Sequence, residues 1–319
     1  MFVDLLKYPV AIISLLCCFI ASAGPYAYIT NQGSNNVSVI DLENNTVIKT
    51  ISVGQHPAGV AVSRSGTRIY ISNPESKDIS VIDAQTDILI KTVPCGDGPV
   101  GIAASPDGKK VFIADWYLNI VSVLDTKSLS VITSIPVGKS PSGITVSPDN
   151  DYIYVANRDD NNLMIIDVGK EKIVDVIPVG KAPFGVTVST SGDLLFVANV
   201  QSGDVSIIDV KQRKLLKSVA VGTFPYAVAH DHLNNRLFVT NQRDNSVSVI
   251  DLTKLNIIKT IEVGEYPEGI DIHPSGEFVY VANWFDDTVS VINTRTLTVI
   301  DEIKTDEGSR AFGHFISQH

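Results

Sequence analysis

Glu268, Asp271 and Arg310 carry charged groups that a polar ligand or a reaction could use. A carboxylate can act as a general base on water, and an arginine beside it can stabilise a developing oxyanion. The same residues could instead orient a polar ligand, with Glu268 and Arg310 forming an ion pair. Equivalent positions elsewhere in the chain hold alanine, threonine or glycine, so a carboxylate at Asp271 needs a hydrogen-bonding partner or water. These residues therefore open two hypotheses, a binding site and a hydrolytic site.

Aromatic side chains and arginines accompany these charged groups in the predicted site. Exposed apolar and aromatic patches mark interaction sites, and Trp, Tyr and Arg are enriched at binding hot spots. The alternative is that each ring folds over its neighbouring loop. The predicted ligand- or partner-binding set is Trp116, Tyr117, Arg158, Phe184, Tyr226, Tyr266, Glu268, Asp271, Trp284, Phe285 and Arg310, with Arg243, Phe224 and His56 nearby.

The elements that hold these residues are seven copies of one short pattern. The copies read YITN, YISN, FIAD, YVAN, FVAN, FVTN and YVAN, and they begin at residues 28, 70, 112, 154, 196, 238 and 280. The spacing is 42 residues throughout, without insertion or deletion. A fixed period of this length indicates identical supersecondary units stacked against one another.

Each copy contains four short runs typical of β-strands, separated by turn residues. In the second copy the runs are 59–63, 68–72, 79–83 and 88–93. This pattern, without helical periodicity, predicts an all-β, seven-bladed β-propeller of four-stranded antiparallel blades. The chain begins with a second strand, at 26–30, and ends with a first strand, at 310–317. We therefore expect the C-terminal strand to join the N-terminal blade and close the ring.

The tetrapeptides, together with the Val-Gly-x-x-Pro segments that begin at Val53, Val137 and Val179, resemble the YVTN family of β-propeller repeat proteins. The resemblance covers residues 24–319 and implies the propeller fold. Members of that family are bacterial and archaeal, mostly exported or surface-located, and share no catalytic motif. The wider superfamily includes lactonase-like propellers, quinoprotein dehydrogenases and WD-repeat scaffolds. The resemblance therefore implies a fold much more than a function.

Comparing the seven copies separates residues with a structural role from candidates for a functional site. A residue type present in all copies has a role common to all blades, so the ring that begins each tetrapeptide is expected to pack between blades. The Asp that ends the third strand is expected to bond turn backbone. Positions where the copies disagree are the candidates for function. At the start of the innermost strand they read Ala58, Val100, Ser142, Phe184, Tyr226, Glu268 and Arg310.

The remaining chemistry-bearing residues are predicted to be structural. His230 and His314 stand where other copies have valine or isoleucine, so buried neutral rings are expected. Cys95 replaces a valine and is expected to be a small buried residue. The His230-Asp231-His232 segment and His273 lack a third spaced ligand, so no metal site is predicted. No cofactor is predicted either, because the sequence has no Cys-x-x-Cys-His segment, no plausible axial pair for a haem and no residues that indicate a quinone site.

Residues 1–23 resemble an export signal, with Lys7, an apolar run over 10–20 and the small-residue segment 21–23. The run is short for a membrane span, which needs about 20 apolar residues. The expected product is one propeller domain over 24–319, monomeric and exported to the periplasm, cell surface or medium. It would retain only Cys95, so no intramolecular disulfide is expected. A net charge of −10 without a Lys/Arg run disfavours nucleic acid as a partner.

Two functions remain open on these grounds. The first is a non-catalytic binding or scaffold propeller that holds a protein, glycan or small ligand on its aromatic face and channel mouth. The absence of insertions and of a nucleophile constellation favours it. The alternative is a lactonase-like hydrolase in the central channel, with Glu268 or Asp271 as general base and Arg310 at the oxyanion.

Overall fold

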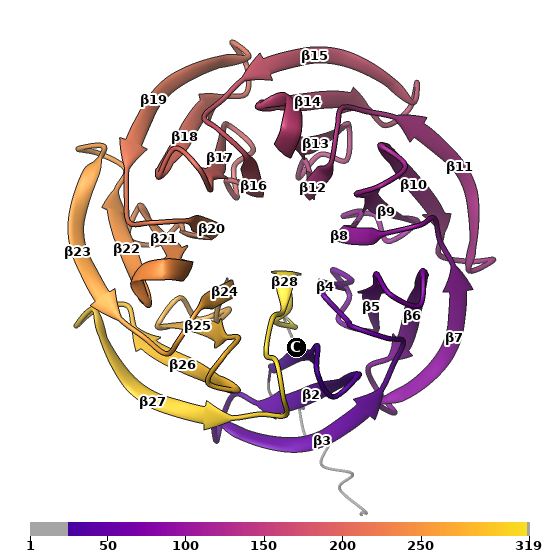
Figure 1. The fold of residues 1–319 in the computed structure, drawn as a ribbon, viewed down its shortest axis with the longest axis horizontal. Helices are drawn as coiled ribbons and strands as arrows, with labels where there is room; N and C mark the ends of the chain where they lie inside the picture. The colour runs from indigo at the N-terminus through magenta and orange to yellow at the C-terminus, as the bar shows by residue number, and fades with distance from the viewer. Residues whose placement is uncertain (1–24, 318–319) are drawn as a thin grey trace, which may run out of the picture.

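The computed structural model describes residues 25–317, so the predicted export signal lies outside the described part. Seven blades stand around a central axis, and the chain runs around the ring once from the N-terminus to the C-terminus (Figure 1). Each blade is an antiparallel sheet whose strands follow in chain order from the axis outward. The prediction of a seven-bladed, all-β propeller is confirmed.

The strands fall into four classes by their distance from the axis. The innermost strands are β4 (Gly59–Val62), β8 (Pro99–Ala104), β12 (Pro141–Val146), β16 (Pro183–Val188), β20 (Pro225–Asp231) and β24 (Pro267–Ile272). The second strands are β1 (Tyr26–Asn31), β5 (Arg68–Asn73), β9 (Lys110–Asp115), β13 (Tyr152–Asn157), β17 (Leu194–Asn199), β21 (Arg236–Asn241) and β25 (Phe278–Asn283).

The two outer classes complete the blades. The third strands are β2 (Asn36–Asp41), β6 (Asp78–Asp83), β10 (Ile120–Asp125), β14 (Asn162–Asp167), β18 (Asp204–Asp209), β22 (Ser246–Asp251) and β26 (Thr288–Asn293). The outermost are β3 (Thr46–Ser52), β7 (Ile88–Pro94), β11 (Ser130–Pro136), β15 (Lys172–Pro178), β19 (Lys214–Ala220), β23 (Asn256–Glu262) and β27 (Thr298–Lys304). Two single-turn 3₁₀ helices, η1 (Arg158–Asp160) and η2 (Gln242–Asp244), follow β13 and β21.

The repeated aromatic rings form the core between blades. All seven are buried, with exposed fractions of 0 to 2%. Phe112, for example, packs in one cluster with Ile144, Val146 and Ile153 of the following blade. Each ring therefore joins two blades, as the repeat predicted, and such rings dominate core energetics.

The repeated asparagine at the end of the second strand is also structural. Asn241 is fully buried, and its Nδ2 donates hydrogen bonds to Ser246 Oγ at 3.1 Å and Ser248 Oγ at 2.9 Å. Its Oδ1 accepts from the backbone N–H of Gly222 at 3.1 Å. One side chain therefore ties the second and third strands to the loop that enters the innermost strand.

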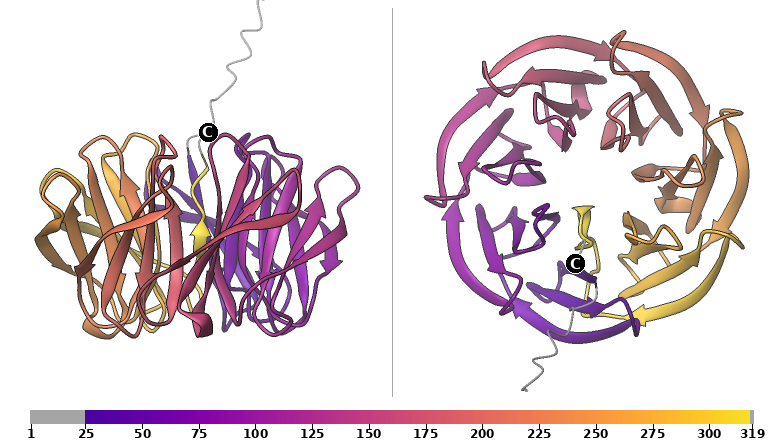
Figure 2. Two further views of the ribbon diagram at one scale, coloured as in Figure 1. Left: turned by 90° about the horizontal axis from the view of Figure 1, so that it is seen from above. Right: turned by 180° about the vertical axis from the view of Figure 1, so that it is seen from behind.

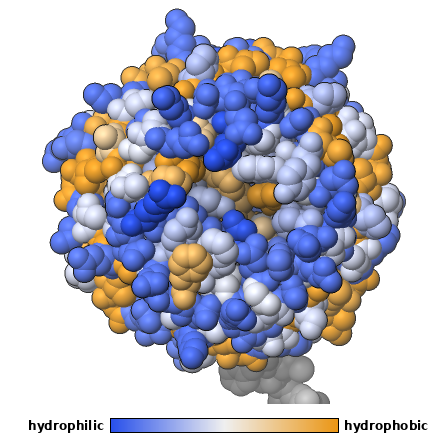
Figure 3. Space-filling view, viewed as in Figure 1, coloured by the Kyte–Doolittle hydropathy of each residue, from blue (hydrophilic) through white to orange (hydrophobic). Residues whose placement is uncertain are grey.

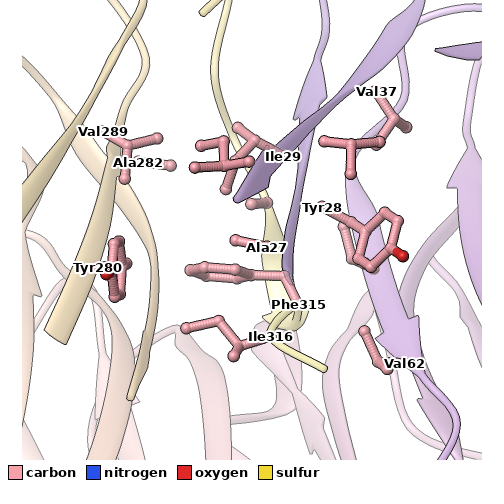
Figure 4. Close-up of a cluster of buried hydrophobic side chains, with 14 of the residues drawn as sticks. Ala27, Tyr28, Ile29, Val37, Val62, Tyr280, Ala282, Val289, Phe315 and Ile316 are labelled. Carbon is pink, nitrogen blue, oxygen red and sulfur yellow. The ribbon is translucent and has the colours of Figure 1, made fainter. Parts of the chain in front are cut away.

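The C-terminal segment closes the ring against the three-stranded N-terminal sheet. Tyr28 N donates to Phe315 O at 2.9 Å, and Ser317 N donates to Tyr26 O at 2.8 Å. Phe315 and Ile316 are fully buried, and Figure 4 shows Phe315 between the side chains of Tyr28 and Tyr280. The predicted closure by the C-terminal strand is confirmed.

The later part of the closing strand is displaced by two residues relative to the other innermost strands, a displacement that we call the slip. Its start keeps the regular register, with Ser309 opposite Asn31. In a regular blade Ile272 lies opposite Val279, and the equivalent pair would be His314 opposite Ala27. The structure instead places Ile316 opposite Ala27. The two extra residues lie toward the axis, where β28 (Phe312–His314) pairs in parallel with β4.

The slip is possible because of the backbone at Gly313. Its φ is +119°, and a Cβ on this residue would meet Val60 O at 2.4 Å. Only glycine accommodates both constraints. The consequence is that Phe312 and His314 face the central channel and do not take the positions that a regular repeat would give them.

Cys95 is the one cysteine in the described part of the chain. Cys95 is buried and free, and burial raises the pKa of its thiol to about 11. The thiol is therefore a packed side chain, as predicted.

Within residues 25–317, no helix is long and apolar enough to cross a membrane.

Candidate functional site

The candidate site lies on one face of the ring, which we call the mouth face. It is formed by the loops that enter the innermost strands and by the loops between second and third strands, and it is the face seen in Figures 1 and 3. Its centre is hollowed, and hydrophobic and hydrophilic residues border the hollow (Figure 3). The right-hand view in Figure 2 shows the opposite face, where Ser317 at the end of the described chain bonds Tyr26.

A plug of three rings fills the channel below the mouth. Phe184 stacks on Tyr226 with ring centroids 4.1 Å apart, and Phe312 lies 4.9 Å from Phe184 and 5.6 Å from Tyr226. All three are buried, with exposed fractions of 6 to 7%. Sequence reasoning found Phe184 and Tyr226 but missed Phe312. Its signal was present, because every other copy has valine or isoleucine at that position.

The Trp116–Tyr117 loop is fixed by Asp115, the one copy in which aspartate replaces the repeated asparagine. Its Oδ1 accepts from the backbone N–H groups of Tyr117 and Leu118, at 3.0 and 2.8 Å. Its Oδ2 accepts from two more in the neighbouring loop, at 2.7 and 3.2 Å. Trp116 then lies against Phe184 of the plug at 6.0 Å, while Tyr117 remains 71% exposed.

A second aromatic cluster lies on another part of the rim. Tyr266, Trp284 and Phe285 contact one another with ring centroids 4.8 to 5.6 Å apart. Their loops are joined because Trp284 N donates to Tyr266 O at 3.1 Å. Phe285 is 59% exposed although its two neighbours cover one side of the ring. Rings therefore fold over neighbouring loops, as the structural alternative predicted, while Tyr117 and Phe285 also reach solvent. The interpretation of these rings as an interaction site stays a prediction.

Arg310 joins the plug to the second cluster. Its Nε donates to Glu268 Oε2, its Nη2 donates to Tyr226 Oη at 2.8 Å, and its guanidinium lies 5.3 Å from the ring of Trp284. The predicted Glu268–Arg310 ion pair is confirmed. Gln242, which sequence reasoning missed, donates to the second carboxylate oxygen of Glu268 at 2.8 Å.

Burial decides the electrostatics of this pair. Glu268 is 1% exposed, and burial raises the pKa of its carboxyl group although Arg310 and Gln242 partly offset that effect. Burial alone would lower the pKa of Arg310, but Glu268 and Tyr226 raise it above its ordinary value. Glu268 and Tyr226 hold the guanidinium of Arg310 in place. Because the carboxylate of Glu268 also offsets its charge, Arg310 is a weaker partner for an oxyanion than an unpaired arginine would be.

The remaining two predicted residues divide between the two sides of the plug. Arg158 is on the mouth face, 5.7 Å from the ring of Trp116, and pairs with Asp159 at 2.8 Å. Asp271 is below the plug, and its Oδ2 accepts from the backbone N–H groups of Phe315 and Ile316 at 2.9 and 3.0 Å. The structure therefore separates Asp271 from Glu268 and Arg310, so these three do not form one site.

Two hollows on the mouth face meet at Gln32 and His56. One, of about 300 Å³, is lined on its far side by Trp116, Tyr117 and Arg310. The other, of about 390 Å³, is lined by residues that include Trp284, Phe285, Asp287 and Glu307. Both volumes fall within the range of small-molecule sites, about 300 to 1,000 Å³. The predicted aromatic residues thus border two adjacent depressions.

A third cavity, which we call the lower channel, lies on the other side of the plug. It has a volume of about 350 Å³ and is lined by the second halves of the innermost strands, with Asp271, His230 and His314 among its polar residues. The expectation that His314 is a buried neutral ring was wrong. Its side chain is 49% exposed, and its Nδ1 lies 2.8 Å from Asp271 Oδ2, because the slip turns it into the channel.

His230 follows the expectation more closely. It is partly buried, its ring lies 5.4 Å from Phe196, and burial lowers the pKa of its imidazole. Within residues 25–317, no group of three or more His, Cys, Asp or Glu side chains could hold a metal ion.

Solved structures of other proteins share this fold. Hydrazine synthase of Kuenenia stuttgartiensis is 24% identical over 84% of this chain and 92% of that chain, with a TM-score of 0.75. A functionally unknown protein from Desulfotomaculum acetoxidans DSM 771 is 14% identical over 91% and 99%, with a TM-score of 0.79. Dihydro-heme d1 dehydrogenase NirN in complex with DHE is 14% identical over 92% and 75%, with a TM-score of 0.69. These likenesses establish the fold alone.

A model of the cytochrome D1 heme domain also matches residues 226–311. Among the described residues that line the two mouth hollows, Arg310 is the only arginine or lysine, and Glu268 and Tyr226 hold it. The described lining of the lower channel contains no lysine or arginine. The match covers residues 226–311 and establishes a likeness of the blades alone.

Sequence comparisons point to the same architecture. A curated protein of Mycobacterium tuberculosis, PE-PGRS family protein PE_PGRS18, is 60% identical over 40 residues, which are 12% of this chain and only 9% of that protein. The model of the YNCE-like beta-propeller family matches residues 63–148 and 102–193. Together with the seven blades, these matches show a seven-bladed β-propeller that is similar to YNCE-like propellers and consistent with the YVTN type.

Proposed function

We propose that this chain is an exported, non-catalytic binding propeller that holds a ligand or partner on its mouth face. The observation that carries the proposal is the pair of adjacent hollows, which meet at Gln32 and His56 and are bordered by the exposed rings of Tyr117 and Phe285. Tryptophan, tyrosine and arginine are the residue types that contribute most to the binding energy of protein interfaces, and all three line these hollows.

Three features support this face over the rest of the surface. Both tryptophans of the chain, Trp116 and Trp284, lie on it. The loops are held rigidly, by Asp115 on one side and by ring stacking on the other, so little conformational entropy is lost on binding. The aromatic residues also depart from the repeat, so the architecture common to all blades does not require them.

The position of the two tryptophans provides the test. A ligand on the mouth face should change tryptophan emission, and at about 100 times its dissociation constant it should add about 2.7 kcal/mol of stability. The panel comprises cell-wall oligosaccharides, short peptides and small lactones. A hit should be lost in Phe285→Ala and kept in Leu233→Ala, because Leu233 is equally exposed, at 60%, on a turn of the opposite face.

Two results would contradict the proposal. One is a ligand whose binding survives Phe285→Ala and Tyr117→Ala. The other is turnover of a lactone that is lost in Glu268→Gln or Asp271→Asn, which would favour the hydrolytic alternative. If the panel gives no hit, an affinity capture with wild type and the Tyr117→Ala/Phe285→Ala variant decides, since a partner on this face should be lost from the variant.

A further inference from the structure

The lower channel is a second cavity with its own chemistry. Aliphatic side chains from several blades make up most of its lining, among them Ile102, Ile144 and Ile270. Phe312 of the plug forms its closed end. Its volume of about 350 Å³ and its apolar walls with few polar groups are the usual properties of a small-molecule site.

The polar group at its centre is a pair that no other blade has. Other copies carry alanine, threonine or glycine at the position of Asp271, and mostly valine or isoleucine at that of His314. Asp271 has a structural role, because its Oδ2 accepts hydrogen bonds from the backbone N–H groups of Phe315 and Ile316 in the slipped strand. Its Oδ1 accepts from Ile272 N at 2.9 Å.

The capping role explains Asp271 but not the ring of His314. Asp271 engages only Nδ1, and the ring is 49% exposed to the channel although innermost strands surround it. Among residues 25–317, no hydrogen bond to Nε2 of His314 is found. This nitrogen is therefore a polar atom held at a fixed place beside an apolar cavity.

The charges around the ring decide its protonation. Burial alone would lower the pKa of His314, but Asp271 raises it above its ordinary value. Burial lowers the pKa of the other imidazole of the cavity, His230, and so favours its neutral form. Glu268 and Arg310 neutralise each other on the far side of Phe312. At mildly acidic pH, the cavity therefore contains one cationic N–H donor, at Nε2 of His314.

We propose that the lower channel binds a small organic acid, whose apolar body fills the cavity and whose carboxylate accepts a hydrogen bond from Nε2 of His314. Among the described residues that line the cavity, Asp271 is the only carboxylate, and its charge is already offset by His314 and three backbone N–H groups, so the cavity favours an anionic over a cationic ligand. An uncharged ligand would lose the attraction of the charged donor, because hydrogen bonds to charged groups are the stronger ones. This site does not depend on the mouth-face proposal.

Calorimetric titration with octanoate and octanamide tests the proposal. The two probes share an apolar chain and differ in charge. At about pH 5.5, octanoate should bind about ten- to a hundredfold more tightly than octanamide, as expected for a hydrogen bond between charged groups. The advantage of octanoate should decrease when the pH is raised to about 9.5, because His314 loses its proton as the pH passes its raised pKa. Equal affinity at both pH values would overturn the proposal, as would an absence of octanoate binding at pH 5.5.

Variants locate the site. His314→Gln should abolish the preference for octanoate, whereas His232→Gln, which changes an exposed histidine on the turn after β20, should keep it. Ala103→Phe should block the cavity from a different blade without touching the pair. The mouth variant Phe285→Ala should leave octanoate binding unchanged. If it alone abolished binding, octanoate would occupy the mouth and the proposal would be wrong.

A nitrogen NMR measurement on the wild-type protein covers the case in which His314→Gln does not fold. Octanoate should shift the Nε2 resonance of one histidine, whose Nδ1 is already bonded. If no histidine resonance moves while octanoate binds, the carboxylate does not contact His314.

Discussion

Two sets of aromatic rings in this molecule have the same chemistry and opposite surroundings. The rings of the repeat, such as Phe238 and Tyr280, are 0 to 1% exposed and pack between blades. The rings of the mouth face, such as Tyr117 and Phe285, are 71 and 59% exposed. The first set occurs once in every blade, and the second breaks the repeat. In a repeat protein, the residues that all copies share therefore report on stability, and the exposed departures from the repeat are the candidates for function.

Removing residues 310–319, which close the ring, should have the largest effect on the stability of the protein. The deletion takes away Phe315 and Ile316, both fully buried, and leaves backbone groups of β1 without partners. Open sheet edges are unfavourable, and closure is what removes them. We expect loss of the cooperative thermal transition followed by circular dichroism. A transition that stays within a few degrees of the wild type would show that the ring does not depend on closure.

Phe238→Ala should have the next largest effect. Truncating a fully buried Phe costs about 3–5 kcal/mol of unfolding free energy. Phe285→Ala should change it by less than about 1 kcal/mol, since surface substitutions mostly have small effects. Urea unfolding measures both values. Similar losses in the two variants would remove the distinction between the two sets of rings.

Asn241→Ala tests the polar part of the shared architecture. It leaves the N–H of Gly222 unsatisfied and removes two bonds to serines, which should cost about 1–3 kcal/mol. The control is Asn44→Ala, an exposed asparagine whose Nδ2 bonds only Asp41. Urea unfolding should show at least a twofold greater loss for Asn241→Ala, and equal losses would contradict a structural role for the repeated asparagine.

The smallest expected effect is a pH dependence of the folding stability that comes from the His314–Asp271 pair. Because the folded-state pKa of His314 is raised, its contribution to stability is fully present below the unfolded-state pKa near 6.5. It is lost as the pH rises through the folded-state pKa. The wild type should therefore lose a little stability between mildly acidic and alkaline pH relative to His314→Gln. Parallel stability profiles of the two proteins would mean that the pair is not charged.

Most of the fold could be predicted from the sequence because the repeat is strict. The four runs of the second copy match β4 to β7 within one residue at each end. The Glu268–Arg310 pair was also predicted, since equivalent positions of neighbouring blades lie side by side. The sequence could not show the two-residue slip of the closing strand, because slipping depends on which side chains fill the last gap in the ring. For that reason Phe312 was missed and His314 was wrongly expected to be buried.

The placement of Asp271 has the same cause. Asp271 and Glu268 lie on the same innermost strand, β24, so the repeat places them close together, but the plug of Phe184, Tyr226 and Phe312 divides the channel between them. Ring packing across the axis involves residues from blades far apart in the chain. A repeat-based alignment contains no information on such contacts.

A ligand titration of the Tyr117→Ala/Phe285→Ala variant beside the wild type, with the first hit of the panel or the captured partner, tests the role of the mouth face. Without ligand the variant should melt at the temperature of the wild type. It should lose the ligand-induced shift in melting temperature and the change in tryptophan emission. A variant that binds as the wild type does, or that melts as early as Phe238→Ala, would contradict this role of the mouth face.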